Sequence, residues 1–207
     1  MLMATRILLA TLVLVAIGQQ LALHLGASYS ALNFFSYFTN LSNLFAAAVL
    51  LLTARSSSFK NAAFRDAARF ASVTNMTVVG LVFAVLLRDV DLGALLPWVN
   101  FVLHYVMPLA ILIDWLWKPP ASMLSARHFI FALVFPVVYL AYVVVRGASV
   151  GWYPYPFLNP ANVGGYGGVA VYAFGIAATF FLAGWALLAV GNRRSAASEA
   201  SQGATGA

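Results

Sequence analysis

The sequence predicts an all-α polytopic membrane protein: a helical bundle of six transmembrane helices with both termini in the cytoplasm. Composition gives the first reason. Of the 207 residues, 63% are hydrophobic and only 8% are charged, whereas a soluble domain has about 25% charged residues. The apolar residues also fall into separate blocks, each suited to a span of about 20 residues. The third reason, the placement of the basic residues, gives the orientation.

Nine of the eleven Lys and Arg residues lie at the N-terminus, in the second and fourth loops between the apolar blocks, and after the last block, all of which fall on one side of the membrane. They are Arg6, Arg55, Lys60, Arg65, Arg69, Lys118, Arg127, Arg193 and Arg194. The loops at the opposite ends contain only Arg88 and Arg146. Because short cytoplasmic loops carry an excess of Lys and Arg, both termini are expected in the cytoplasm. Orientation in the membrane thus explains the net charge of +6, and we expect no nucleic-acid partner.

The six expected segments follow one another with short loops between them. They are Ile7–Leu25, Phe34–Ala54, Phe70–Leu87, Leu95–Trp117, Phe129–Val145 and Tyr166–Gly191. The first resembles a cleaved signal peptide, but its apolar character resumes at Leu21, which favours a retained helix. Residues 1–194 therefore form one transmembrane domain. The small, polar stretch 195–207 is expected to be a disordered tail.

Two polar clusters stand near the outer ends of the second and fourth segments. The stretch FFSYFTNLSN contains Thr39, Ser42 and Asn43, and the stretch NFVLHYVMP contains Asn100 and His104. Polar groups at membrane depth are costly unless paired, and they often mark functional sites. Both segments run inward from the outer face. Thr39 and His104 therefore lie at similar depth, and we expect them to face each other.

This pair has the composition of a nucleophile and its base. Histidine can take the proton of a threonine hydroxyl, which is otherwise a weak nucleophile. Thr39 lies in the opening turns of its helix, where the positive dipole end favours an oxyanion. Ser42 and Asn43 are candidates for holding that oxyanion or orienting the substrate, and Asn100 for fixing the tautomer of His104. The alternative is structural, with each polar group bonded to its own helix, and physical chemistry alone favours it.

The motifs around Thr39 and His104 (FFSYFTNLSN and LHYVMPLAILIDW) resemble the two signature sites of the androgen-induced-gene family of membrane hydrolases. The late YPYPFLNP and the glycines after it are similar to that family's shorter bacterial relatives. The resemblance implies a threonine hydrolase that cleaves lipid esters such as fatty acid esters of hydroxy fatty acids. It maps the nucleophile onto Thr39 and the base onto His104. It also implies membrane lipids as partners and a bacterial inner (plasma) membrane as the location.

Other polar residues carry subsidiary predictions. Pro108 should kink the fourth segment and open space beside His104. Arg88 and Arg146 flank the outer boundary and are candidates for binding a substrate carboxylate. Asp114 is expected to pair with a basic loop residue or with Asn75 near the inner face.

No metal or other cofactor is expected. The chain has no cysteine, which excludes thiolate metal sites and a cysteine nucleophile. One alternative function is a transporter or channel for ions or small molecules, which would need polar residues throughout the membrane. A second is a haem-binding redox protein, for which His24 and His104 are the nearest pair of histidines in depth.

Overall fold

The computed structural model describes residues 3–54, 61–90 and 95–205, with side chains as far as residue 197. All regular structure in these residues is helical, which confirms the all-α class. Five stretches are long and apolar enough to cross a membrane. They are α1 (Met3–Gly26), Ala62–Leu87, Pro97–Trp117, α7 (Ala126–Val150) and the larger part of α8 (Tyr166–Thr205). These stretches indicate a multi-pass integral membrane protein.

The second expected segment is divided into two helices. A short α2 (Ala31–Phe34) precedes α3 (Phe38–Ala54), an apolar helix of 17 residues. At the break, the Ser36 hydroxyl donates to the carbonyl of Leu32, and the Tyr139 hydroxyl on α7 donates to the carbonyl of Ser36. The expected start at Phe34 is therefore wrong, because a contact with α7 stabilises a turn that local sequence does not reveal. Thr39 consequently lies in the first turn of α3.

Two segments contain widened, π-helical turns. The helix α4 (Ala62–Val82) continues into η2 (Phe83–Leu87), and the fourth segment runs through α5 (Pro97–Phe101), η3 (Val102–Val106) and α6 (Met107–Trp117). Pro108 has no N–H to donate to the carbonyl of His104, as an α-helix would require. The widened turn η3 lies directly before it, and such turns are common at functional sites. The expected distortion near Pro108 thus takes the form of a π-helical turn containing His104.

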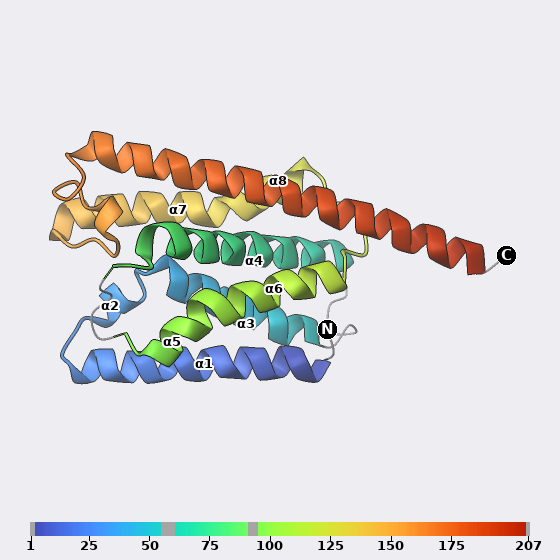
Figure 1. Cartoon of the computed structure of the whole chain (residues 1–207), viewed down its shortest axis with the longest axis horizontal. Helices are drawn as coiled ribbons and strands as arrows, with labels where there is room; N and C mark the ends of the chain where they lie inside the picture. The colour runs from blue at the N-terminus through green and yellow to red at the C-terminus, as the bar shows by residue number, and fades with distance from the viewer. Residues whose placement is uncertain (1–2, 55–60, 91–94, 206–207) are drawn as a thin grey trace.

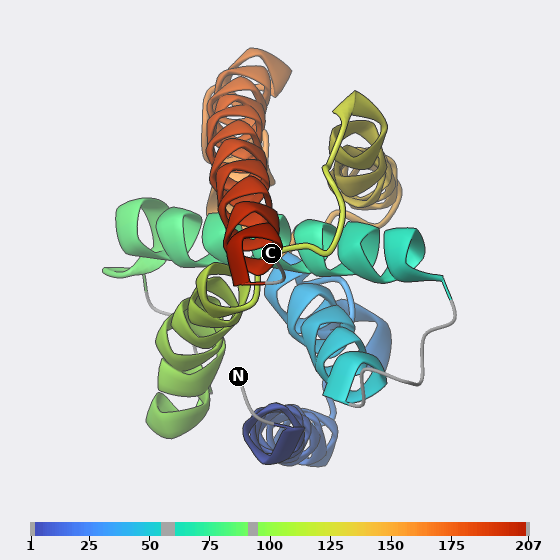
Figure 2. The same cartoon turned by 90° about the vertical axis from the view of Figure 1, so that its right-hand side faces the viewer.

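The helix α4 lies at the centre of the bundle. Viewed end-on, α7 and α8 lie on one side of it, and α1, α3 and α6 lie on the other (Figure 2). Its sequence suits this position, because small and apolar residues are buried on all of its faces. The asparagine before it, Asn61, caps the helix by accepting a hydrogen bond from the N–H of Phe64 at 3.1 Å.

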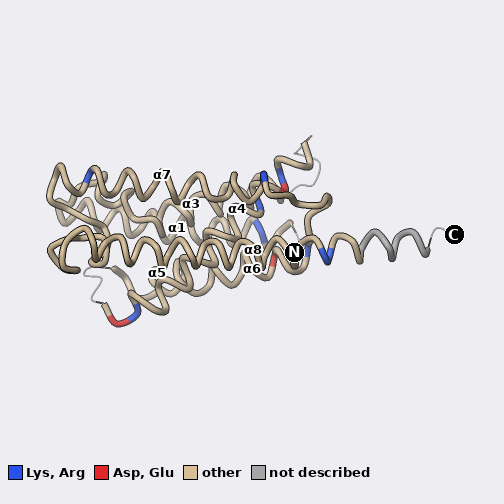
Figure 3. Tube along the Cα trace, turned by 90° about the horizontal axis from the view of Figure 1, so that it is seen from above, with Lys and Arg blue, Asp and Glu red and all other residues tan. Residues whose placement is uncertain are grey.

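Helix α1 begins at the same end of the bundle at which helix α8 ends (Figure 1). Most Lys and Arg residues gather at that end (Figure 3). Helix α8 continues to Thr205, through most of the stretch expected to be a disordered tail. Ser195 is buried, and its hydroxyl donates to the carbonyl of Pro120. The expected domain boundary at residue 194 and the expected disorder of the tail stay predictions.

The outer surfaces of α7 and α8 are apolar. Large side chains such as Val137, Val145, Phe174 and Leu182 are more than half exposed. In water such a surface would be unfavourable, whereas in lipid it needs no cover. Exposure of this kind supports the membrane class independently of hydropathy.

Candidate active site

Thr39 and His104 are brought together as the sequence predicts. The Thr39 Oγ1 lies 3.3 Å from Nε2 of His104, and both residues are buried. Thr39 comes from the first turn of α3 and His104 from the middle of η3. A candidate base must lie within hydrogen-bond reach of the proton it removes. This pair satisfies that condition at the long end of the usual range.

The second ring nitrogen of His104 is bound to Asn100. Nδ1 lies 2.6 Å from Asn100 Oδ1 and 3.2 Å from the Asn100 carbonyl oxygen. A carbonyl oxygen only accepts, so Nδ1 carries the hydrogen and the neutral ring presents a lone pair at Nε2. Phe83 of η2 stacks on the ring with centroids 4.0 Å apart. The imidazole is therefore held in the tautomer and orientation that a base for Thr39 requires.

Tyr155 is a third member of the candidate site, and no sequence pattern predicts it there. Its hydroxyl accepts from the backbone N–H of Thr39 at 3.3 Å and lies 3.4 Å from Thr39 Oγ1. It belongs to the loop between α7 and α8, just before the short helix η4 (Pro156–Leu158). Burial raises the pKa of the Tyr155 phenol, so the hydroxyl stays protonated at neutral pH. The YPYPFLNP motif was the available signal, but nothing in it distinguishes Tyr155 from its neighbours.

Thr39 lies between two cavities of different character. One cavity, of about 260 Å³, is apolar and lies among α3, α4, α7, α8 and η4. Val137 and Phe181, which are both more than half exposed, are part of its lining, so it reaches the outer apolar surface. The other cavity, of about 490 Å³, has a wall of mixed polar and apolar residues that includes His104, and we call it the polar cavity because it is much more polar than the first. A molecule with one apolar and one polar half would place its junction at Thr39.

We compared the chain with known proteins. No family model, no curated protein and no solved structure matches it. The chemistry of the site therefore has to be argued from its own geometry.

Asn43 is at the site but is committed to the backbone. Its Nδ2 donates to the carbonyl of Thr39 at 2.9 Å and to the carbonyl of Leu103 at 3.3 Å. Both N–H groups are thus used to join α3 to η3, which leaves none for an oxyanion. Asn43 therefore bonds to the backbone on both sides of the site, and its expected role toward the substrate stays a prediction. Ser42 is fully buried, belongs to neither cavity wall, and its Oγ has no hydrogen bond to the described residues.

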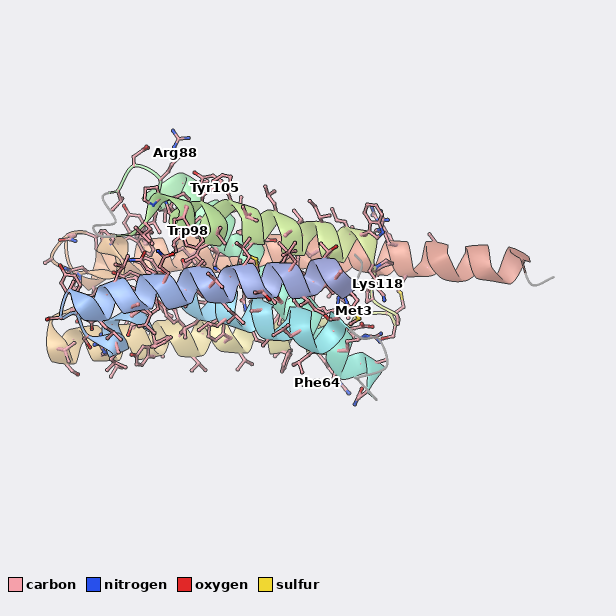
Figure 4. The ribbon with its side chains drawn as sticks, turned by 90° about the horizontal axis from the view of Figure 1, so that it is seen from below. Met3, Phe64, Arg88, Trp98, Tyr105 and Lys118 are labelled. Carbon is pink, nitrogen blue, oxygen red and sulfur yellow. The ribbon has the colours of Figure 1, made fainter. Side chains whose placement is uncertain are left out.

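The two arginines proposed to bind a carboxylate occupy different positions. Arg88 is exposed, lies 3.6 Å from Asp89 and points away from the bundle at the end opposite Met3 and Lys118 (Figure 4). Arg146 donates to Asn33 Oδ1 at 2.6 Å and lies over the ring of Trp152. Asn33 and Trp152 form part of the wall of the polar cavity, and Arg146 does not. Arg146 therefore contacts two residues of that wall without lining the cavity itself.

Asp114 is part of a separate cluster at the other end of the bundle. Its carboxylate accepts two hydrogen bonds from Arg6 at 2.9 Å and one from Arg69 at 3.2 Å. The same arginines also donate to the carbonyls of Thr53 and Lys118. The expected pairing of Asp114 with a basic residue is confirmed, and the partner is an arginine rather than Asn75.

The haem alternative gains no support from the histidines. His24 also lies in the wall of the polar cavity, but its Nε2 is 3.0 Å from the carbonyl oxygen of Ser30. The Nε2 of His104 faces Thr39. Each atom already has a partner within the described residues, so neither is free to serve as an axial ligand.

Proposed function

We propose that this protein is an intramembrane hydrolase that cleaves lipid esters. One observation carries the proposal: a buried threonine hydroxyl faces a histidine of fixed tautomer at the meeting point of an apolar and a polar cavity. A purely structural Thr–His contact needs no adjacent space. Here Thr39 lines two cavities, which is what an ester with its carbonyl at Thr39 requires.

The proposed topology has six membrane crossings, the shorter α3 included, with both termini in the cytoplasm. The shared location of the two chain ends and the gathering of basic residues there support it (Figures 1 and 3). Thr39 and His104 then lie in the outer half of the membrane. For a bacterial protein the membrane would be the inner (plasma) membrane, as the family resemblance implies.

In the proposed reaction, Thr39 Oγ attacks the ester carbonyl while Nε2 of His104 takes the hydroxyl proton. The resulting imidazolium is stabilised by the Nδ1–H bond to Asn100. The tetrahedral intermediate collapses, and the departing alcohol receives the proton from Nε2. The acyl group remains esterified to Thr39. A water molecule then loses a proton to His104 and attacks the acyl carbonyl. The bond between the acyl carbon and Thr39 Oγ breaks, Nε2 of His104 returns the proton to Oγ, and the fatty acid leaves.

Tyr155 supplies the donor that the tetrahedral intermediate needs. Its hydroxyl lies 3.4 Å from Thr39 Oγ1, so it is within reach of an oxygen on the carbon that Oγ1 attacks. A protonated phenol donates to a developing oxyanion. Asn43 cannot fill this role because both of its N–H groups are used.

The substrate reaches Thr39 from the surrounding lipid. The apolar cavity extends to exposed side chains of α7 and α8, so an acyl chain can enter laterally without passing through water. Fatty acid esters of hydroxy fatty acids are the lipid esters that the family resemblance implies. The membrane lipids are then both solvent and source of substrate.

Labelling with a fluorophosphonate, which reacts with activated hydroxyl nucleophiles, tests the proposal. The wild-type protein in detergent should be labelled, and Thr39→Ala should not. Thr179→Ala is the matched control, because Thr179 is a partly exposed threonine on α8 whose hydroxyl donates to the carbonyl of Gly175 in its own helix. It should be labelled like the wild type. Labelling that persists in Thr39→Ala would remove Thr39 as the nucleophile.

A further inference from the structure

The polar cavity carries information about the alcohol half of the ester. Four asparagines lie in its wall, and each uses only one end of its amide within the protein. The other end of each has no hydrogen bond to a described residue. Two of the unused ends are donors and two are acceptors, and this combination indicates the chemical class of the ligand.

Two of the asparagines leave a donor unused. Asn33 Oδ1 accepts from Arg146 at 2.6 Å, and Asn159 Oδ1 accepts from the N–H of Ala161 at 3.0 Å. These partners can only donate, so the oxygen of each amide is fixed toward them. The Nδ2 group of each asparagine is therefore the end that remains for a ligand.

The other two asparagines leave an acceptor unused. Asn40 Nδ2 donates to the carbonyl of Phe34 at 2.8 Å, and Asn162 Nδ2 donates to the carbonyl of Pro156 at 3.4 Å. A carbonyl can only accept, so the amide nitrogen is fixed toward it. The Oδ1 atom of each asparagine remains for a ligand.

A wall with both donors and acceptors matches hydroxyl groups, each of which donates and accepts. A carboxylate would use the donors and leave the buried acceptor of Asn40 unpaired, which is unfavourable. A cationic headgroup would use the acceptors and leave the Nδ2 donors of Asn33 and Asn159 unused. Tyr37 and Trp152 add aromatic surface for the carbon side of a polyol.

We infer that the polar cavity binds an uncharged polyol, so that the substrate is a polyol ester whose acyl chain occupies the apolar cavity. Glycerol and sugars share this chemistry. The inference rests on the proposed hydrolase function and narrows it. The reaction is hydrolysis as written above, with the polyol as the departing alcohol.

Purified protein should be assayed with decanoyl esters that differ only in the alcohol: glycerol, glucose, methanol and a hydroxy fatty acid. We expect kcat/KM for the glycerol or the glucose ester to exceed that for the methyl ester and the hydroxy fatty acid ester by at least about tenfold, the usual effect of one or two well-placed hydrogen bonds. The better of the two polyol esters identifies the natural class.

Two variants connect the preference to the wall. Asn162→Leu removes an exposed acceptor, and Asn33→Leu removes a donor; each should lower the polyol-to-methyl ratio of kcat/KM about tenfold. Ser149→Leu is the control, because Ser149 is exposed, bonds only to Val145 and belongs to neither cavity wall. It should keep the wild-type ratio.

The outcomes separate the two proposals. Hydrolysis that depends on Thr39 but favours the hydroxy fatty acid ester, or shows no preference over methanol, overturns the polyol inference and leaves the hydrolase standing. An unchanged ratio in both asparagine variants also overturns it. Hydrolysis of no ester, or hydrolysis that survives Thr39→Ala, overturns the proposed function and the inference with it.

Discussion

The bundle buries two polar clusters, one toward each end, and they are built on opposite plans. At the end that the proposed topology places on the cytoplasmic side, Asp114 is enclosed by Arg6 and Arg69, and neither described cavity reaches it; we call these three residues the inner cluster. Toward the opposite end, Thr39 and His104 share one contact, and Thr39 lines two cavities; we call this pair the outer cluster. In the inner cluster both carboxylate oxygens of Asp114 are bound by arginines, and Nε of Arg69 is buried without a partner among the described residues. In the outer cluster Thr39 adjoins open space.

This contrast shows how to distinguish a polar group that stabilises a membrane bundle from one that does chemistry. The three inner residues join α1, α4 and α6, and none of them lines either described cavity. Burial alone does not separate the two clusters, because both are buried. The useful criterion is whether space adjoins the polar atom once its protein partners are counted.

The largest expected effect tests the outer cluster. His104→Ala removes the base, so turnover of a lipid ester should fall by about 10²–10⁴-fold, while the protein remains folded. Steady-state kinetics on purified protein, with thermal unfolding of the same sample, measures both. Turnover within a few-fold of wild type would remove His104 as the base and weaken the contrast between the clusters.

The next effect tests the inner cluster. Asp114→Ala leaves two buried guanidinium groups unpaired, which should cost about 3–5 kcal/mol of stability and lower Tm by roughly 10 °C. The remaining folded protein should hydrolyse ester at the wild-type rate. Asp89→Ala is the matched control, because the carboxylate of Asp89 is exposed, and its Tm should hardly change. A specific loss of turnover in folded Asp114→Ala would show that the inner cluster is functional too.

Tyr155→Phe should have a smaller effect on the outer cluster. It removes one hydroxyl and keeps the ring, so kcat should fall about 100-fold as an oxyanion donor is lost. KM should change little. Tyr172→Phe, on an exposed ring of α8 that stacks on Phe157, should behave like wild type. Equal kcat for the two variants would assign Tyr155 a packing role.

Asn100→Ala should have the smallest effect. The carbonyl of Asn100 also lies near Nδ1 of His104, at 3.2 Å, and it remains in the variant. Fixing of the tautomer is therefore weakened but not lost, and we expect kcat to fall about tenfold. A loss as large as that of His104→Ala would mean that the backbone carbonyl cannot replace the side chain.

Much of the fold follows from hydropathy, because apolar blocks of span length have few structures open to them in a membrane. The expected segments correspond to helices. What the sequence does not reveal is local: the break at 35–37 depends on Tyr139, and the early start of α4 depends on Asn61 and on tertiary packing. The contact of Tyr139 with Ser36 joins residues distant in the chain. The cap at Asn61 lies before the apolar block from which the third segment was predicted.

The site was predictable where it depended on depth and helical spacing. Thr39 and His104 could be paired because parallel helices place similar positions at similar depth, and Asn100 lies one turn from His104. Tyr155 could not be found in this way, because it reaches the site from a loop whose path has no periodic pattern. The roles of Asn43 and Arg146 were also hidden, since only their contacts show that they are already occupied.

The position of Thr39 between two cavities has a consequence for the fate of the acyl group. In the proposed reaction, once the alcohol has left the polar cavity, the acyl chain would still occupy the apolar one and stay attached to Thr39. Any hydroxyl compound that then fills the polar cavity competes with water for the same carbonyl. A hydrolase built this way is also a transacylase, and the ratio of ester exchange to hydrolysis would rise with the concentration of acceptor alcohol.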